Sequence, residues 1–329
     1  MGFVRYQSDS GGTDFETSAK RDDAIILQGF WRHDTIDAIR AANPDCKILI
    51  YQNISRTSVP DAEGRYNSAI SRLEAQERGW DSDTDDGQEP WLKYVEPNDA
   101  DGYGRFALER MLDKLEESEA AGRPVDGIFL DDVNSFAPDV QGGDPTSTAE
   151  QWDSWMADVN QIVGPGLKER GYQVMANLSG AMAQRNLASG GWEESQFEHF
   201  THVFDEYFAW WPDGGPQPRR YVDEAFRLAG VAEEEGTVFV ASVPDAGDEG
   251  KVEFALAMLL VQAPSYALKA PGRGDAEPWY DVHDRALALG QPTGDPEEDD
   301  AGVWTRKFGN GSVTLDLEAR TAEIRLLTE

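Results

Sequence analysis

Cysteine is almost absent from this chain of 329 residues, since Cys46 is the only one. No disulfide framework can therefore form within the chain. Cys46 lies in an apolar stretch that predicts a strand, and only four histidines are present to activate a thiol. We therefore expect Cys46 to be a small buried side chain and not a catalytic nucleophile.

Basic residues are also scarce, with 29 Lys and Arg against 62 Asp and Glu and a net charge of −33. High net charge usually indicates disorder, but ten Trp, ten Tyr and 14 Phe indicate a folded core. A folded protein tolerates such self-repulsion in molar salt, where the Debye length is about 3 Å. We therefore expect a high-salt environment and exclude nucleic acid and anionic membranes as partners.

Long apolar runs are missing as well. The longest, Phe254–Val261, is far too short to span a bilayer, so we expect no membrane insertion. Residues 1–12 are polar and glycine-rich, which does not fit a signal peptide. The location therefore stays open between a high-salt cytoplasm and a virion or extracellular brine.

Several cofactor motifs are lacking. The chain has no Walker loop, no dinucleotide fingerprint and no Gly-Xaa-Ser-Xaa-Gly elbow. Its histidines show no metal-ligand spacing with cysteine or acidic residues. We expect neither a cofactor nor a metal.

Short apolar stretches alternate with helical patterns over residues 24–270. Eight stretches are candidate strands: 24–29, 46–52, 91–95, 125–130, 173–177, 202–208, 237–242 and 265–268. This count and rhythm predict an α/β fold, a (β/α)8 TIM barrel.

Three domains of unequal size follow from this pattern. We expect an irregular lead-in over 1–23, the barrel over 24–295, and a small antiparallel β-sheet over 296–329 packed on the barrel. Asn310-Gly311 lies between two β-like runs and is a strong hairpin signal.

The most informative stretch is 125–134, where the apolar run Ile128-Phe129-Leu130 ends in two carboxylates, Asp131 and Asp132. Such charges are costly unless they are paired or face a solvated cleft. In α/β folds the cleft lies at the carboxyl ends of the strands, which predicts a catalytic mouth here. Only one of two adjacent residues can face the barrel axis; we expect Asp131 to be catalytic and Asp132 to support it. The alternative is that one caps a helix or pairs with an arginine.

Other strand ends carry polar residues too. They are Gln28, Asn53, Asn177, Glu206 and Ser242. Acids and amides converging on one mouth suit a polyhydroxylated ligand, and two carboxylates on different strands suit glycoside hydrolysis. Glu206 as a structural ion pair is the alternative.

Aromatic residues follow Glu206 directly. Tyr207, Trp210 and Trp211 are predicted to stack on sugar rings, and the alternative is that they pack the loop.

Four motifs resemble one family. Asp-Gly-Ile-Phe-Leu-Asp-Asp-Val (126–133), Lys-Ile-Leu-Ile-Tyr-Gln-Asn (47–53), Met-Ala-Asn (175–177) and Asp-Glu-Tyr-Phe (205–208) are similar to motifs of glycoside-hydrolase-like TIM barrels. These barrels are distantly similar to endo-α-1,4-polygalactosaminidases. The tail around Arg306–Gly311 resembles the hairpin that closes such proteins. The resemblance implies a barrel, a polysaccharide substrate, and Asp131 with Glu206 as the catalytic pair.

The leading hypothesis is a halophilic glycosidase that cleaves an acidic or amino-sugar surface glycan. Asp131 is the expected nucleophile or base and Glu206 the expected general acid. The alternative is a barrel that grips glycan without cleaving it, such as a receptor-binding or tail component of a halophilic virus, within a larger assembly. A third reading, a cytosolic sugar-processing enzyme, predicts activity on short oligosaccharides.

Overall fold

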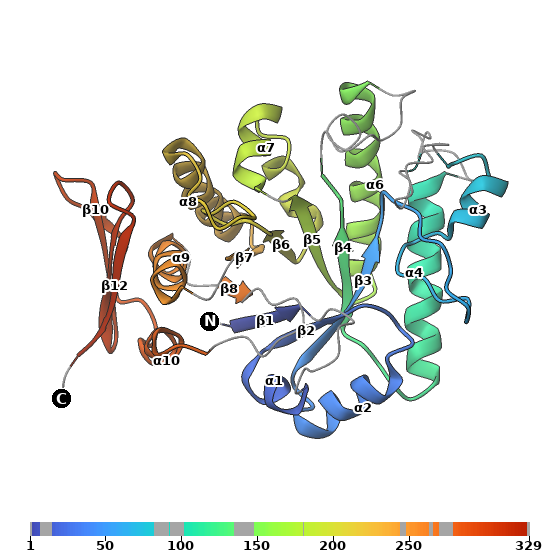
Figure 1. The fold of residues 1–329 in the computed structure, drawn as a ribbon, viewed down its shortest axis with the longest axis horizontal. Helices are drawn as coiled ribbons and strands as arrows, with labels where there is room; N and C mark the ends of the chain where they lie inside the picture. The colour runs from blue at the N-terminus through green and yellow to red at the C-terminus, as the bar shows by residue number, and fades with distance from the viewer. Residues whose placement is uncertain are drawn as a thin grey trace.

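The computed structural model describes residues 2–6, 15–81, 92, 102–134, 148–179, 181–243, 248–262, 266–269 and 279–327. Eight parallel strands form its centre: β1 (Gly2–Tyr6), β2 (Ala24–Leu27), β3 (Lys47–Asn53), β4 (Gly127–Asp131), β5 (Gln173–Ser179), β6 (His202–Asp205), β7 (Val238–Ser242) and β8 (Tyr266–Lys269). They pair in chain order, and β1 also pairs with β8, which closes a barrel (Figure 1). The predicted (β/α)8 fold is confirmed.

The structure differs from the prediction at two strands of the barrel, one that was not predicted and one that was predicted but is not part of it. Residues 2–6 were expected in an irregular lead-in but form β1. The buried Arg5, paired with Asp22 at 2.7 Å, interrupts the apolar pattern and hides this strand. Of the expected strand 91–95, only Leu92 lies within the described residues, where it forms an isolated bridge. β3 pairs directly with β4, so no strand separates them in the barrel.

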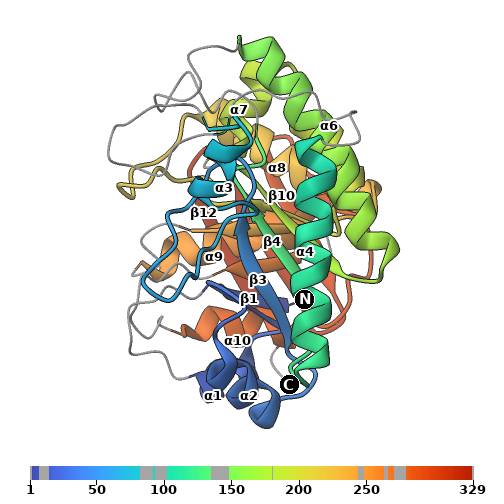
Figure 2. The same cartoon turned by 90° about the vertical axis from the view of Figure 1, so that its right-hand side faces the viewer.

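Helices surround the strands. They are α1 (Phe15–Arg21), α2 (His33–Ala42), α3 (Arg72–Glu77), α4 (Tyr103–Ala120), α6 (Ala149–Glu169), α7 (Met182–Ser189), the 3-10 helix η1 (Glu194–His199), α8 (Arg219–Glu234), α9 (Glu249–Gln262) and α10 (Asp281–Ala288). α6 begins with a capping box, in which Thr148 and Gln151 satisfy each other's backbone N–H groups. α4 and α6 pack side by side (Figure 2). A Cβ at Gly104 would lie 3.2 Å from the Ile162 side chain, so glycine permits this close approach.

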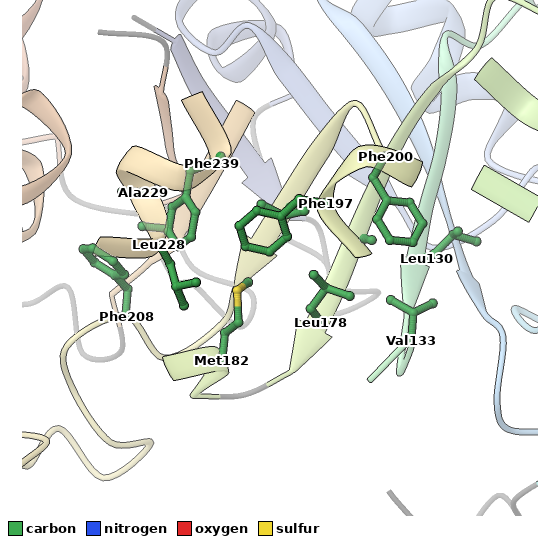
Figure 3. Close-up of a cluster of buried hydrophobic side chains, with 14 of the residues drawn as sticks. Leu130, Val133, Leu178, Met182, Phe197, Phe200, Phe208, Leu228, Ala229 and Phe239 are labelled. Carbon is green, nitrogen blue, oxygen red and sulfur yellow. The ribbon is translucent and has the colours of Figure 1, made fainter. Parts of the chain in front are cut away.

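The barrel has two apolar layers because side chains alternate along each strand. One set fills the interior: Val4, Ala24, Ile26, Leu49, Phe129, Met175, Phe204 and Val240. The alternate set packs outward against the helices, and Figure 3 shows part of this layer, with Leu130, Leu178 and Phe239 meeting Met182, Phe197 and Leu228. Cys46 is buried, as predicted, and packs in the outer layer; burial raises the pKa of its thiol to about 12.

The C-terminal segment forms a separate antiparallel sheet. Its strands are β9 (Glu297–Glu298), β10 (Val303–Phe308), β11 (Gly311–Asp316) and β12 (Thr321–Leu326), in the order β12-β11-β10-β9. The predicted hairpin joins β10 and β11. Figure 1 shows the sheet outside α9 and α10. The domain boundary at residues 295 and 296 stays a prediction.

Several arginines attach this sheet to the barrel, and the most deeply buried of them belongs to the tail motif. Arg306 of β10 is 8% exposed and donates to the carbonyl oxygens of Leu260 and Val261, at 3.2 and 3.0 Å. These carbonyls lie in the last turn of α9, where the helix dipole favours a cation. The arginine of the tail motif is thus a structural residue.

No helix in the described ranges combines the length and the apolar character needed to cross a membrane.

Candidate active site

The inward-facing side chains of the barrel become polar at its carboxyl end. Two positions beyond the interior residues Phe129, Met175 and Phe204, the chain carries Asp131, Asn177 and Glu206. Gln28 likewise lies two positions after the interior residue Ile26, and Ser242 lies two positions after Val240. Asn53 lies four positions after Leu49. Since residues two apart share a face of a strand, all six candidates lie in the inward phase.

Asp131 is held by three donors. Its Oδ2 accepts from Tyr51 Oη at 2.6 Å, and its Oδ1 accepts from Asn177 Nδ2 at 2.8 Å and from the Asp132 backbone N–H at 3.0 Å. Both Oδ1 contacts come from N–H groups, which can only donate. The arrangement fixes the position of the carboxyl group.

Asn177 joins Asp131 to Glu206. Its Nδ2 lies 2.8 Å from Asp131 Oδ1 and 3.2 Å from Glu206 Oε2. Because both oxygens contact one nitrogen, they are at most about 6 Å apart. Three residues from three neighbouring strand ends, β4, β5 and β6, therefore form one compact cluster.

Asp132 turns away from the strand direction and contacts the end of β3. Its φ of 55° is left-handed, a conformation that Asp adopts more readily than most residues. Its Oδ2 accepts from Asn53 Nδ2 at 2.7 Å and pairs with Arg56 Nε at 3.0 Å. Burial and the charge of Asp131 raise the pKa of Asp132 to about 7, although Arg56 acts against this.

Asn53 was predicted to bind substrate, but its amide is occupied. Its Oδ1 accepts from the backbone N–H groups of Ser55 and Arg56, while its Nδ2 donates to Asp132. Asn53 is 3% exposed and therefore positions Asp132. A direct contact of Asn53 with substrate stays a prediction.

Gln28 and Ser242 lie at the rim of the cluster. Gln28 is half-buried, and its Oε1 accepts from Asn67 Nδ2 at 3.3 Å. Ser242 is 2% exposed at the end of β7. Their roles in binding stay predictions.

The predicted aromatic residues take different positions. Trp210 is 8% exposed and packs at 6.2 Å from Phe254 of α9, with Lys251 of the same helix 5.2 Å from its ring centre. Trp211 contacts Tyr221 of α8 edge-on at 5.9 Å. Both rings therefore pack loop against helix, and their stacking on sugar stays a prediction. Tyr207 is half-buried, and its stacking stays a prediction.

Sequence reasoning missed two members of the site, Tyr51 and Arg56. Tyr51 is half-buried in the barrel, stacks on Phe129 at 5.9 Å and reaches Asp131. Tyr51 lies two residues before Asn53, so both side chains share the inward face of the strand. The alternation of side chains along the strand could therefore have identified Tyr51. Arg56 lies after β3 and carried no such signal.

Asp205 faces outward, next to the site. It is 1% exposed, and its Oδ1 accepts from the backbone N–H groups of Met182 and Tyr207 at 3.2 and 3.3 Å. Burial raises the pKa of Asp205 to about 7. The side chain links β6 to the start of α7.

Asp205→Asn is expected to change the pH dependence of stability. The folded protein keeps the Asp205 proton up to about pH 7, whereas the unfolded chain loses it near pH 4, so wild-type stability falls between these values. The asparagine oxygen can accept the same two hydrogen bonds without this loss. Between pH 4 and pH 8 the variant should therefore gain up to about 4 kcal/mol relative to wild type. Denaturant unfolding at both pH values measures this, and an equal stability difference at both would contradict it.

The fold and the cluster define a class: a TIM barrel with paired carboxylates at the carboxyl ends of its strands, as in glycoside hydrolases. The chain belongs to hypothetical glycosyl hydrolase family 15, whose model matches residues 40–312. No curated protein matches the chain.

Three solved structures are among those similar in fold. Trehalose-6-phosphate hydrolase of Bacillus licheniformis is 10% identical, with a TM-score of 0.45 over 82% of this chain and 64% of that one. A β-galactosidase of the Antarctic haloarchaeon Halorubrum lacusprofundi is 11% identical, with a TM-score of 0.48 over 82% and 52%. A family 39 glycoside hydrolase of Bacteroides cellulosilyticus is 10% identical, with a TM-score of 0.47 over 95% and 70%. The chain thus spans less than two thirds of the first two.

Proposed function

We propose that the protein is a retaining glycoside hydrolase with Asp131 as the nucleophile and Glu206 as the general acid and base. The observation that carries this proposal is the contact of both carboxylates with Asn177 Nδ2, which limits the distance between two of their oxygens to about 6 Å. Retaining enzymes hold their carboxyl groups roughly 5–5.5 Å apart, whereas inverting enzymes need roughly 6.5–9.5 Å to admit a water.

The proposed reaction has two steps. Asp131 attacks the anomeric carbon and forms a glycosyl ester, while Glu206 gives its proton to the departing glycosidic oxygen. Glu206 then takes a proton from water, the water oxygen bonds to the anomeric carbon, and the bond to Asp131 breaks. Both carboxyl groups return to their starting state, so water is the only co-reactant.

The neighbours of Asp131 have supporting roles in this reaction. The hydrogen bonds from Tyr51, Asn177 and the Asp132 backbone orient the nucleophile. The Oδ1 atom of Asn177 is buried and has no hydrogen-bond partner within the described residues, and its Nδ2 atom holds the two carboxylates together. Asp132 is a positioning residue, because its carboxylate contacts Asn53 and Arg56.

The proposed substrate is a surface or extracellular polysaccharide of a high-salt environment, with acidic or amino sugars. The net charge of −33 supports the high-salt setting, because such a surface repels itself strongly at low ionic strength. The resemblance of four motifs to relatives of the polygalactosaminidases supports a polymer as the substrate.

Release of reducing ends at molar salt tests this function. The wild type, incubated with acidic and amino-sugar polysaccharides and with surface polysaccharide of halophilic cells, should release reducing ends from at least one of them. Binding to the same polymers is measured in parallel by co-sedimentation. If the polymers bind and no reducing ends appear, the barrel grips glycan without cleaving it and the enzyme proposal fails.

A further inference from the structure

A cavity outside the cluster of carboxylates lies between the start of α2, the segment 64–66 and α4. Its volume is about 310 Å³, near the lower end of small-ligand sites, which run from about 300 to 1,000 Å³. Trp31, Arg65, Tyr66 and Lys114 are among the residues that line it. In a chain with only 29 basic residues, a cavity with several cations stands out from the rest of the surface.

Lys114 carries a charge that no carboxylate of the described residues contacts directly, although Glu117 and Glu74 act on it from a greater distance. Its Nζ donates to Gln52 Oε1 at 3.1 Å and lies 4.5 Å from the ring centre of Tyr66. No carboxylate of the described residues lies within ion-pair distance of it, whereas Arg65 pairs with Asp61 at 2.7 Å and Arg123 with Asp37 at 2.9 Å. An ammonium has three donors, so two N–H groups remain for a ligand.

The unpaired charge is also poorly solvated. Burial lowers the pKa of Lys114 to about 8, which means that the folded protein disfavours the bare ammonium. A ligand with a carboxylate would relieve this cost, because a buried opposite charge favours the charged form.

The aromatic walls indicate what carries that carboxylate. Trp31 lies across the backbone of Gly29, where a Cβ would come within 2.2 Å of the ring, so only glycine permits this position. The Arg65 guanidinium lies 5.8 Å from the Trp31 ring centre. Trp31 and Tyr66 are half-buried and line the cavity, where they offer apolar contact area to a sugar ring.

The cavity adjoins the mouth of the barrel. Asn67, the residue after Tyr66, donates to Gln28 Oε1 at the end of β2. The segment that carries Tyr66 therefore connects the cavity wall to the end of β2.

We propose that this cavity is a binding site for a uronic acid unit of the glycan, with Lys114 contacting its carboxylate and Trp31 and Tyr66 its ring. This assignment rests on the proposed function in one respect: the uronic acid unit is taken to belong to the polymer bound in the mouth. Molar salt screens exposed charges but acts much less on buried pairs, so a half-buried lysine suits recognition in brine.

Binding of D-glucuronate, measured by calorimetry and saturation-transfer NMR at molar KCl, tests this site. Wild type should bind glucuronate, and Lys114→Met should bind it about 10-fold more weakly or worse, since a charged hydrogen bond is lost. Trp31→Ala should weaken it as well, and it leaves the Gln52 contact of Lys114 in place. Lys20→Met, on the exposed face of α1, is the matched control and should bind like wild type.

Further ligands and pH distinguish the outcomes. Glucose has the sugar ring without the carboxylate, and acetate has the carboxylate without the ring. Each should bind at least about 10-fold more weakly than glucuronate. Glucuronate affinity should fall as pH rises through about 8, where Lys114 loses its proton. The charged groups around Lys114 are Arg110 and Glu117 on α4, Glu74 on α3, and Arg65, Arg123 and His33 on the cavity wall.

Failure of this site and failure of the proposed function give different results. Asp131→Asn should abolish hydrolysis and keep glucuronate binding. Equal affinity of wild type and Lys114→Met for glucuronate would overturn the site even if polymers are cleaved. Lys114-dependent binding without any hydrolysis would support the site and overturn the enzyme.

Discussion

Asp131→Asn is expected to lower kcat by about 10⁴-fold or more, because removal of a nucleophile leaves only binding and orientation. Asparagine matches the shape of the carboxylate. With its oxygen at the Oδ1 position it can still accept from Asn177 Nδ2 and from the Asp132 backbone N–H, and its amide nitrogen can donate to Tyr51 Oη. KM and the thermal unfolding midpoint should therefore change little. Initial rates of reducing-end release at molar salt give kcat and KM for both proteins.

Asp45→Asn is the matched control for this substitution. Asp45 is exposed just before β3, at the opposite end of the barrel, and should tolerate the change with full activity. If Asp131→Asn keeps more than about a tenth of the wild-type kcat, Asp131 is not the nucleophile. In that case the hydrogen bonds around it serve the fold alone.

Glu206→Gln is expected to lower kcat by about 10²–10⁴-fold, the usual contribution of general acid and base catalysis. The loss should depend on the leaving group. Natural polymer needs a proton on its departing oxygen, whereas an aryl glycoside with an acidic phenol does not. Added azide should restore turnover of the aryl glycoside, because it attacks the glycosyl ester without needing a base.

Glu198→Gln serves as the control, since Glu198 is exposed in η1 at the amino end of β6. It should behave like wild type on both kinds of substrate. An equal loss on polymer and aryl glycoside in Glu206→Gln would contradict the acid role. Such a result would fit a glutamate that only positions Asn177.

Most of the barrel could be predicted because its strands are buried on both sides. Stretches such as Ile25–Leu27 and Ile128–Leu130 are continuous apolar runs, which only a covered parallel sheet explains. β1 was not predicted because it contains a charged residue, Arg5. This charge is paired with Asp22, which lies 17 residues away and which no local pattern identifies as its partner. The stretch 91–95 has the composition of a strand, and pairing of β3 with β4 leaves no place for it in the barrel.

The main residues of the site could be predicted, but the hydrogen bonds and packing contacts among them could not. Alternation placed Asp131, Asn177 and Glu206 on one face, since each follows an interior residue by two positions. Alternation could not predict that the Asn53 amide donates to Asp132. It also could not predict that the Trp210 ring packs against α9. Both depend on contacts between segments far apart in the chain.

The most direct test of the account is the anomeric configuration of the first product that the wild type releases, followed by proton NMR before mutarotation. The close pair of Asp131 and Glu206 predicts that the new reducing end keeps the configuration of the cleaved bond, because two displacements occur at the same carbon. Release of the opposite anomer first would contradict the account, because it requires a water between the two carboxylates.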